Sequence, residues 1–190
     1  ATLLFAAACA WIAVVLLMMR ARLHPPRLSP IRALLALGRA HPDDLGFPYT
    51  QIRFEVDYVG RRIGLHGSLV LNPTPSNHLV IVLHGFADSS AGAAAWLPML
   101  SRCGVNVLLL DQPGHGESDD AICTAGWFER HAIPQVIDRM REDYPLASSR
   151  ITLLGISMGA VTAMAAACLD SRIADVIIDS PYADYRKACR

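Results

Sequence analysis

The chain has 190 residues, of which 53% are hydrophobic, and its 17 basic residues balance its 17 acidic residues. That length suits one domain with a sizeable core. Zero net charge and the lack of a basic patch interleaved with aromatic residues exclude a nucleic-acid-binding protein. The five cysteines are scattered without metal-site spacing, so the sequence indicates neither a zinc site nor an oxidising compartment.

The N-terminal segment from Ala1 to Met19 carries no charge, and Thr2 is its only conventional polar side chain. As a helix this run would reach about 28 Å, close to the roughly 30 Å hydrocarbon core of a bilayer. A cleaved signal peptide usually has a shorter apolar core, and a buried globular helix of this length is seldom apolar on every side. We therefore predict a single-pass transmembrane anchor over residues 1–20. Four arginines follow and favour a cytoplasmic location for the rest of the chain: Arg20, Arg22, Arg27 and Arg32.

Residues 21–46 read as a juxtamembrane linker. His24–Pro30 holds three prolines, and Ile31–Ala40 has the pattern of a short amphipathic helix. The helix-breaking residues His41 to Asp44 and Gly46 to Pro48 then mark a boundary. We predict that the globular domain covers residues 47–190.

Strand and helix patterns alternate along this domain. Two alternating segments, Gln51–Tyr58 and Arg62–Leu71, flank Gly60 and predict an antiparallel hairpin. Continuous apolar runs then indicate strands covered on both faces, and helical patterns lie between them. Buried strands that alternate with helices predict an α/β fold with a mostly parallel sheet, right-handed crossovers and helices on both faces. The runs are Leu79–Leu83, Val105–Leu110, Ile151–Leu154 and Ile173–Ile178, and the helices are about Ala91–Arg102 (with Pro98 in a first turn), Phe128–Tyr144 and Met158–Leu169.

Gly155-Ile156-Ser157-Met158-Gly159 is a G-x-S-x-G motif between a predicted buried strand and an Ala-rich helix. This setting is that of a nucleophile elbow, a tight turn that strains its serine and exposes the hydroxyl. The two glycines leave room for neighbouring backbone. We predict that Ser157 is a nucleophile, with the positive end of the helix behind it. The alternative is a simple helix cap formed by Ser157.

His84-Gly85-Phe86 follows the strand that ends at Leu83. An acyl-transfer site needs N–H donors aimed at the oxyanion of the intermediate. We predict the N–H groups of Phe86 and Met158 in this role, with Gly85 letting the backbone come close. His84 is expected to hold the loop by hydrogen bonds and not to transfer protons.

Four motifs follow one another along the chain: L-H-G-F (Leu83–Phe86), D-Q-P-G-H-G-E-S (Asp111–Ser118), G-I-S-M-G (Gly155–Gly159) and D-S-P-Y-A-D (Asp179–Asp184). Together they resemble the α/β-hydrolase superfamily, most closely its membrane-anchored, serine-aminopeptidase-like bacterial branch. The resemblance runs from about residue 47 to residue 190. It implies an α/β-hydrolase fold in which the turn at 111–118 shapes the edge of the site. His115, within that turn, is expected to be structural.

The family orders its catalytic triad as serine, then acid, then histidine. No histidine follows Ser157, and His131, in a predicted crossover helix, is expected to face solvent. The chain begins with Ala1 instead of Met, and its last residues read like the start of a further segment. We therefore expect a piece of a longer protein whose histidine, and normally whose acid, lie beyond it. Asp179, at a strand end, is a candidate acid because some relatives place the acid one strand early.

These observations predict a serine hydrolase that cleaves a carboxylic ester, a thioester or a peptide or amide bond through an acyl-enzyme on Ser157. The 190-residue piece alone is expected to hydrolyse almost nothing. No metal or organic cofactor is implied. The expected partners are a small-molecule, lipid-derived or peptide substrate and a membrane contacted by residues 1–19. The alternative is a catalytically inactive, membrane-tethered binding module, while a serine at position 157 disfavours dehalogenase chemistry, which uses a carboxylate nucleophile.

Overall fold

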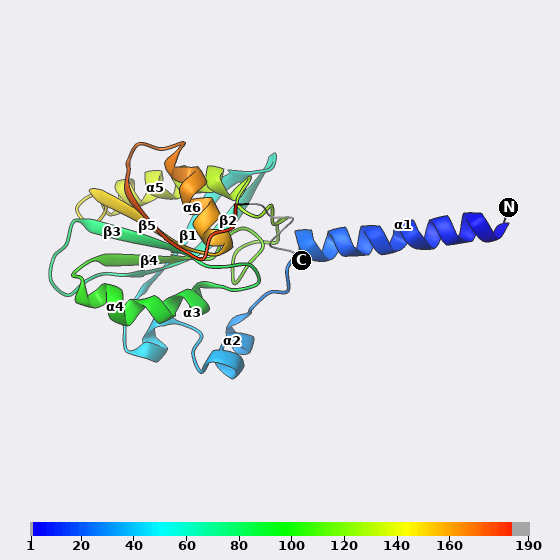
Figure 1. Cartoon of the computed structure of the whole chain (residues 1–190). Helices are drawn as coiled ribbons and strands as arrows, with labels where there is room; N and C mark the ends of the chain where they lie inside the picture. The colour runs from blue at the N-terminus through cyan, green and yellow to red at the C-terminus, as the bar shows by residue number, and fades with distance from the viewer. Residues whose placement is uncertain (1, 184–190) are drawn as a thin grey trace.

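The computed structural model describes residues 2–183 (Figure 1). Its helices and strands alternate from residue 78 onward, as the sequence pattern predicts. In chain order the elements are α1 (Thr2–Leu23), α2 (Pro30–Leu37), η1 (Pro42–Leu45), β1 (Thr50–Tyr58), β2 (Arg61–Val70), β3 (His78–Leu83), α3 (Ser90–Ala93), η2 (Ala94–Trp96), α4 (Leu97–Arg102), β4 (Asn106–Leu110), η3 (Glu129–His131), α5 (Ala132–Asp143), β5 (Arg150–Ile156), α6 (Met158–Ala167) and β6 (Ile173–Asp179).

The strands form one sheet in the order β1-β2-β4-β3-β5-β6. β1 and β2 make the predicted antiparallel hairpin, in which Tyr58 pairs with Arg61 and Gly60 takes a positive φ of 74° in the turn. β2 also runs antiparallel to β4, whereas β3, β4, β5 and β6 are parallel to one another. The predicted fold, a mostly parallel sheet with an antiparallel hairpin before it, is confirmed.

The sheet is covered on both faces because successive side chains of its central strands point in opposite directions. In β3, Leu79 and Ile81 pack into a core with α5 and α6, while Val80 and Val82 pack into a second core. Leu97 and Leu100 of the α4 helix complete that second core. The parallel strands therefore have helices on both sides. Because these strands run in the same direction, their carboxyl ends lie along one edge of the sheet.

Two predictions about individual elements are wrong in detail. The predicted helix Ala91–Arg102 is divided into α3, η2 and α4, and Pro98 lies in the first turn of α4, where its missing N–H costs no hydrogen bond. β6 is not covered on both faces by the described residues, because Ile177 and Ile178 are 47% and 44% exposed. β6 stands at the sheet edge and pairs with β5 alone among the described strands.

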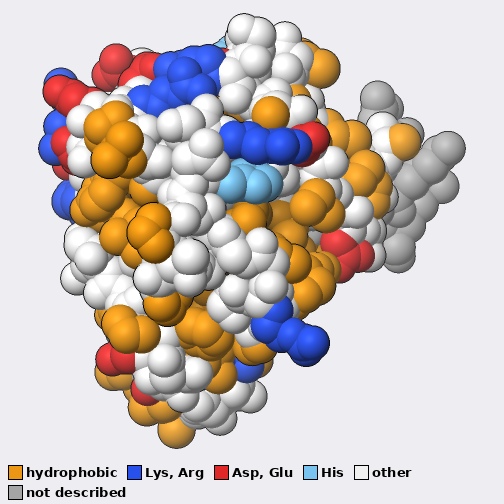
Figure 2. Space-filling model, turned by 90° about the vertical axis from the view of Figure 1, so that its left-hand side faces the viewer, with side chains coloured by type: hydrophobic (Ala, Val, Ile, Leu, Met, Phe, Trp, Pro, Cys, Tyr) orange, Lys and Arg blue, Asp and Glu red, His pale blue; other side chains and the backbone are white. Residues whose placement is uncertain are grey.

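The helix α1 projects away from the sheet and its covering helices (Figure 1). Phe5–Leu23 is long and apolar enough to cross a membrane, and none of its most apolar stretch is buried within the structure. A signal sequence would pass the same test of length and composition. The opposite face of the molecule, shown in Figure 2, gathers charged side chains mainly in its upper part and hydrophobic ones below them.

Candidate active site

Ser157 lies at the bend between β5 and α6, at the carboxyl edge of the parallel strands. Its backbone angles are φ 52° and ψ −110°, a conformation that costs free energy in a residue with a Cβ. Its side chain makes no capping hydrogen bond, so the geometry does not match the helix-cap alternative. The Ser157 N–H donates to the carbonyl of Asp179 at 2.8 Å, and this bond holds the bend.

Gly155 and Gly159 are both required by close backbone contacts. A Cβ on Gly159 would lie 2.0 Å from the Leu83 carbonyl oxygen, and one on Gly155 would lie 2.3 Å from the Gly159 carbonyl oxygen. Gly85 differs, since a Cβ there would make an ordinary contact of 3.6 Å with the Ser157 Cβ. The bend therefore needs its two flanking glycines, while Gly85 has space for a methyl group.

The position of Gly85 places the loop after β3 against Ser157. Phe86 follows directly in that loop, and Met158 begins α6. Among the described residues, the backbone N–H groups of Phe86 and Met158 meet no protein acceptor. Both N–H groups are therefore unoccupied by the described residues.

The side chain of His84 holds the loop after β3 in place by hydrogen bonds. Its Nδ1 lies 2.7 Å from the Gly85 carbonyl oxygen, and its Nε2 accepts a 3.0 Å hydrogen bond from the Gln112 N–H. The imidazole is therefore neutral, with its proton on Nδ1. Gln112 also donates to the His84 carbonyl and accepts from the Thr162 hydroxyl of α6. This network joins the loops after β3 and β4 to the helix behind Ser157.

The turn at 111–118 is built around the buried carboxylate of Asp111. That carboxylate accepts hydrogen bonds from the N–H groups of Ser90, at 2.5 Å, and Glu117, at 2.9 Å. Burial alone would raise its pKa, but the interaction with His66 and these N–H bonds outweigh burial and lower the pKa below its usual value. Asp111 is thus an ionised structural group that ties together the loops at the edge of the site.

His115 is fully buried behind the loop after β3. Its ring centroid lies 5.0 Å from that of His84 and 6.2 Å from that of Phe86. Nδ1 bonds to the Pro113 carbonyl, while Nε2 has no hydrogen-bond partner among the described residues. Burial lowers the pKa of His115 to about 4, so the ring is neutral near pH 7.

A buried glutamate that sequence reasoning missed organises the loop beside α6. The Glu129 carboxylate accepts hydrogen bonds from the Thr124 N–H and hydroxyl, the Gly126 N–H and the Tyr58 hydroxyl. In the same loop the Cys123 sulfur lies 3.3 Å from the sulfur of Met158. Burial, followed by the Glu129 charge, raises the pKa of Cys123 to about 12, so this thiol does not compete as a nucleophile.

No pattern in the sequence identifies Glu129 as a structural residue, because its hydrogen-bond partners lie in an irregular loop and on β1. Gln112 and Thr162 were also missed as supports, although the D-Q-P-G-H-G-E-S motif already marked Gln112.

The candidate acid Asp179 ends β6, and its half-buried carboxylate accepts a hydrogen bond from the Ser180 hydroxyl at 2.8 Å. Only its backbone carbonyl bonds to Ser157. His131 is exposed, as predicted, and its Nε2 accepts from Arg130 at 3.2 Å. Among the described residues, no histidine is bonded to the Ser157 hydroxyl.

One group of side chains has the composition of a cation site. His66, Asp111 and Glu117 each offer a ligand atom within 4.8 Å of the others. His66 Nδ1 is 3.4 Å from an oxygen of Asp111, and both Asp111 oxygens already accept backbone N–H bonds. This arrangement matches a structural contact between His66 and Asp111 better than an open set of metal ligands, because the Asp111 oxygens are already occupied.

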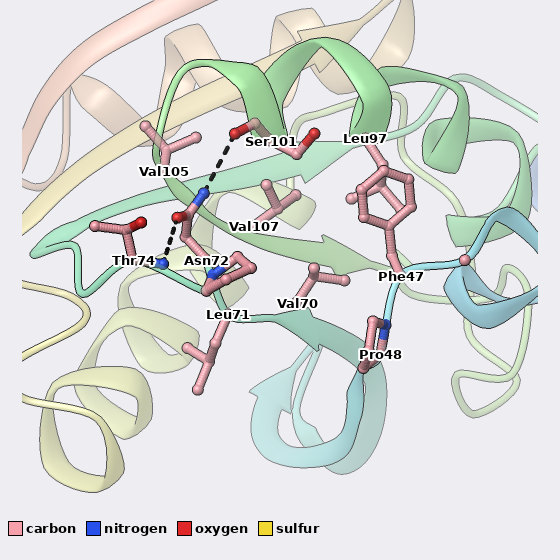
Figure 3. A pocket seen from close by; sticks show the side chains of 12 residues that line it. Phe47, Pro48, Val70, Leu71, Asn72, Thr74, Leu97, Ser101, Val105 and Val107 are labelled. Carbon is pink, nitrogen blue, oxygen red and sulfur yellow. Dashed lines mark hydrogen bonds between the residues drawn. The ribbon is translucent and has the colours of Figure 1, made fainter.

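A cavity of about 450 Å³ lies at the opposite end of the sheet (Figure 3). Val105 and Val107, at the start of β4, form part of its wall, and the Phe47 ring lies next to Leu97. The amide of Asn72 is occupied by hydrogen bonds to the Ser101 carbonyl and the Thr74 N–H. With no charged or titratable side chain in its lining, this cavity offers no group for acyl chemistry. The lining residues are Gly46, Phe47, Pro48, Val70, Leu71, Asn72, Pro73, Thr74, Leu97, Ser101, Val105 and Val107.

A family described as the alpha/beta hydrolase fold matches residues 78–187, more than half of the chain. The chain belongs to this family. A proline iminopeptidase of Saccharolobus solfataricus is 34% identical over 90 residues, which are 47% of this chain and 28% of that protein.

Solved structures agree with this assignment. An esterase of Pyrococcus furiosus superposes with a TM-score of 0.72 at 28% identity, covering 83% of this chain and 58% of the esterase. A thermophilic esterase of Thermogutta terrifontis, at 21% identity and a TM-score of 0.58, shares the fold over 73% of this chain and 49% of its own. The α/β-hydrolase chain described here thus spans less than two thirds of the length of these relatives.

Proposed function

We propose that this protein is a serine hydrolase that forms an acyl-enzyme on Ser157. The observation that carries the proposal is the strained bend at Ser157, with φ 52°, set against the loop that holds Phe86. A strained backbone conformation persists only where surrounding contacts hold it in place, and such residues are concentrated at active sites. The relatives support hydrolysis, since the one at 34% identity is named an iminopeptidase and the one at 28% identity is an esterase.

In the proposed reaction the Ser157 hydroxyl attacks a carbonyl carbon and its proton passes to a general base. The negative oxygen of the intermediate accepts hydrogen bonds from the N–H groups of Phe86 and Met158. Removal of one such donor typically slows the reaction about 100- to 1000-fold. The leaving group departs with the transferred proton, and water then releases the acid and restores the serine.

We propose a histidine as the general base, and the described residues hold no histidine hydrogen-bonded to the Ser157 hydroxyl. Both ring nitrogens of His84 are engaged, His115 is buried with its proton directed to Pro113, and His131 bonds to Arg130. Asp179 is the candidate acid within this chain. We assign residues 1–20 to a membrane anchor, 21–46 to a juxtamembrane segment and 47–190 to the hydrolase domain, with that domain in the cytoplasm. The substrate is an ester, a thioester or a peptide or amide.

A fluorophosphonate probe, which reacts with activated serines, tests the proposal on the protein expressed from the complete gene. We expect labelling that is lost in Ser157→Ala. Ser149→Ala is the matched control, because Ser149 is exposed and lies just before β5, at the opposite edge of the sheet from Ser157. Asp179→Asn should reduce labelling only if Asp179 is the acid. Folded protein that fails to label would favour the membrane-tethered binding module.

A further inference from the structure

The segment between α1 and the sheet is bound to the edge that carries Ser157. The Leu23 carbonyl, at the end of α1, accepts a 2.7 Å hydrogen bond from the Cys123 N–H. Cys123 in turn touches Met158, the first residue of α6. One residue therefore separates the end of the apolar helix from the turn that presents Ser157.

Two further contacts hold the rest of this segment on the same edge. Arg27 donates to the Gly116 carbonyl in the loop after β4, at 3.5 Å. Arg39, just after α2, donates to the Ala91 carbonyl at 2.9 Å, and Ala91 lies in α3 after the β3 loop. Residues 23–39 thus follow the carboxyl edge of the sheet and do not form a free tether.

The α2 helix has its apolar face turned outward. Ile31, Leu34 and Leu35 occupy positions i, i+3 and i+4, which share one side of a helix. They are 74%, 52% and 83% exposed, whereas the small Ala33, on the opposite side, is fully buried. A helix on the surface of a soluble domain normally shows the reverse arrangement. An exposed apolar face of this kind marks a contact with a partner or a membrane.

The chain itself indicates which contact this is. Only residues 24–29 separate α1 from α2, so α2 begins within about 25 Å of the end of the apolar helix. Arg20 and Arg22, in the last turn of α1, and Arg32 on α2 add positive charge that attracts anionic headgroups. Trp127, in the loop that begins at Cys123, is 61% exposed with the Arg130 guanidinium 4.1 Å from its ring. Tryptophan beside arginine is suited to the interfacial zone of a bilayer.

We propose that α2 lies in the membrane interface and that the edge of the sheet holding Ser157 faces the bilayer, so that the enzyme hydrolyses acyl esters of the lipid phase. This inference rests on the proposed function, because it names the substrate class of the same site. An ester in the bilayer would reach Ser157 along α2 without crossing bulk water. Hydrolysis would add water across the ester bond and return a fatty acid and an alcohol.

Fluorescence quenching tests the orientation independently of catalysis. The complete protein is placed in phosphatidylcholine–phosphatidylglycerol vesicles that contain acyl-chain-brominated phosphatidylcholine. Single tryptophans are introduced as Leu35→Trp or Leu146→Trp, with Trp11, Trp96, Trp127 and any tryptophan outside residues 1–190 changed to phenylalanine. Leu146 is 86% exposed in the turn before β5, at the opposite edge, and serves as the matched control. We expect bromine to remove about half or more of the Leu35→Trp emission, because interfacial helices sit about 5–10 Å deep, and to leave Leu146→Trp unchanged.

Hydrolysis supplies the second measurement. The double variant Ile31→Ser and Leu35→Ser should cleave a long-chain ester held in vesicles roughly 100-fold more slowly, since burial of each of the two side chains is worth about a factor of ten. Its rate on a water-soluble acetate ester should stay unchanged, and Leu146→Ser should alter neither rate. Equal quenching at positions 35 and 146, or equal loss on both esters, would overturn the orientation. Failure of the proposed function would show differently, as acetate hydrolysis that does not depend on Ser157.

Discussion

Gly159→Ala places a methyl group in the most crowded position of the bend. The added Cβ would lie 2.0 Å from the Leu83 carbonyl oxygen and 2.7 Å from that of His84, both in backbone that cannot rotate away. To reach even 3.0 Å, α6 and the β3 loop must separate by about 1 Å. A displacement of that size within a catalytic site costs about 100-fold in rate, and overpacking of this kind costs about 1–3 kcal/mol of stability.

Two measurements on the protein from the complete gene check this prediction: the rate of fluorophosphonate labelling and the free energy of unfolding in urea. Gly85→Ala is the control, because its Cβ would make only ordinary contacts, at 3.6 and 3.7 Å. We expect the control to label within about threefold of the wild type and to unfold at the same urea concentration, as tolerated substitutions do. Unchanged labelling and stability in Gly159→Ala would refute the inference that close packing at position 159 sets the position of Ser157.

Three further substitutions test the supports of the site. Since burial lowers the pKa of His115 to about 4 from 6.5, the unfolded chain binds a proton between these values that the folded chain does not. Stability should therefore decline by about 3 kcal/mol as the pH falls from 6.5 to 4, and a urea series on His115→Asn should lack this slope. The ionised carboxylate of Asp111, whose folded pKa is lowered, stabilises the protein above pH 3.8, and this contribution is lost as the pH falls through the folded pKa. Asp111→Asn should lower the free energy of unfolding by about 2 kcal/mol at pH 7 and weaken its dependence on pH in the acid range. An unchanged pH dependence would contradict this role of Asp111. Glu129→Gln should cost about 2–3 kcal/mol in the same assay because one oxygen that accepts two bonds is replaced by a donor, whereas the exposed Glu142→Gln should change little.

Much of the fold followed from local pattern. The apolar runs identified β3, β4 and β5 within two residues of their ends, because strands buried on both faces have little freedom in composition. The bend at Ser157 was predictable for a similar reason. A strand that passes directly into a helix, with glycines at positions 155 and 159, can adopt few other backbone conformations between them. The order of the strands was less accessible. β4 lies between β2 and β3 in the sheet. The hydrophobic pattern of each segment does not indicate that β4 pairs with β2 of the earlier hairpin.

What escaped prediction depends on contacts distant in sequence. Residues 21–46 have the prolines of a linker, yet Arg27 and Arg39 bind carbonyl groups 89 and 52 residues away. Glu129 similarly gathers partners from its own loop and from β1. Gly85 shows the opposite error, because the sequence suggested a close backbone approach and the structure leaves space for a Cβ. Such outcomes follow from three-dimensional packing and not from periodicity.

The hydrogen bond from Ser157 to Asp179 imposes an order on synthesis. The amide that steadies the reactive turn finds its acceptor 22 residues later, at the end of β6. A nascent chain that has released the bend but not β6 from the ribosome lacks this acceptor. The bend at Ser157 therefore gains this support only after the last described strand has joined the sheet.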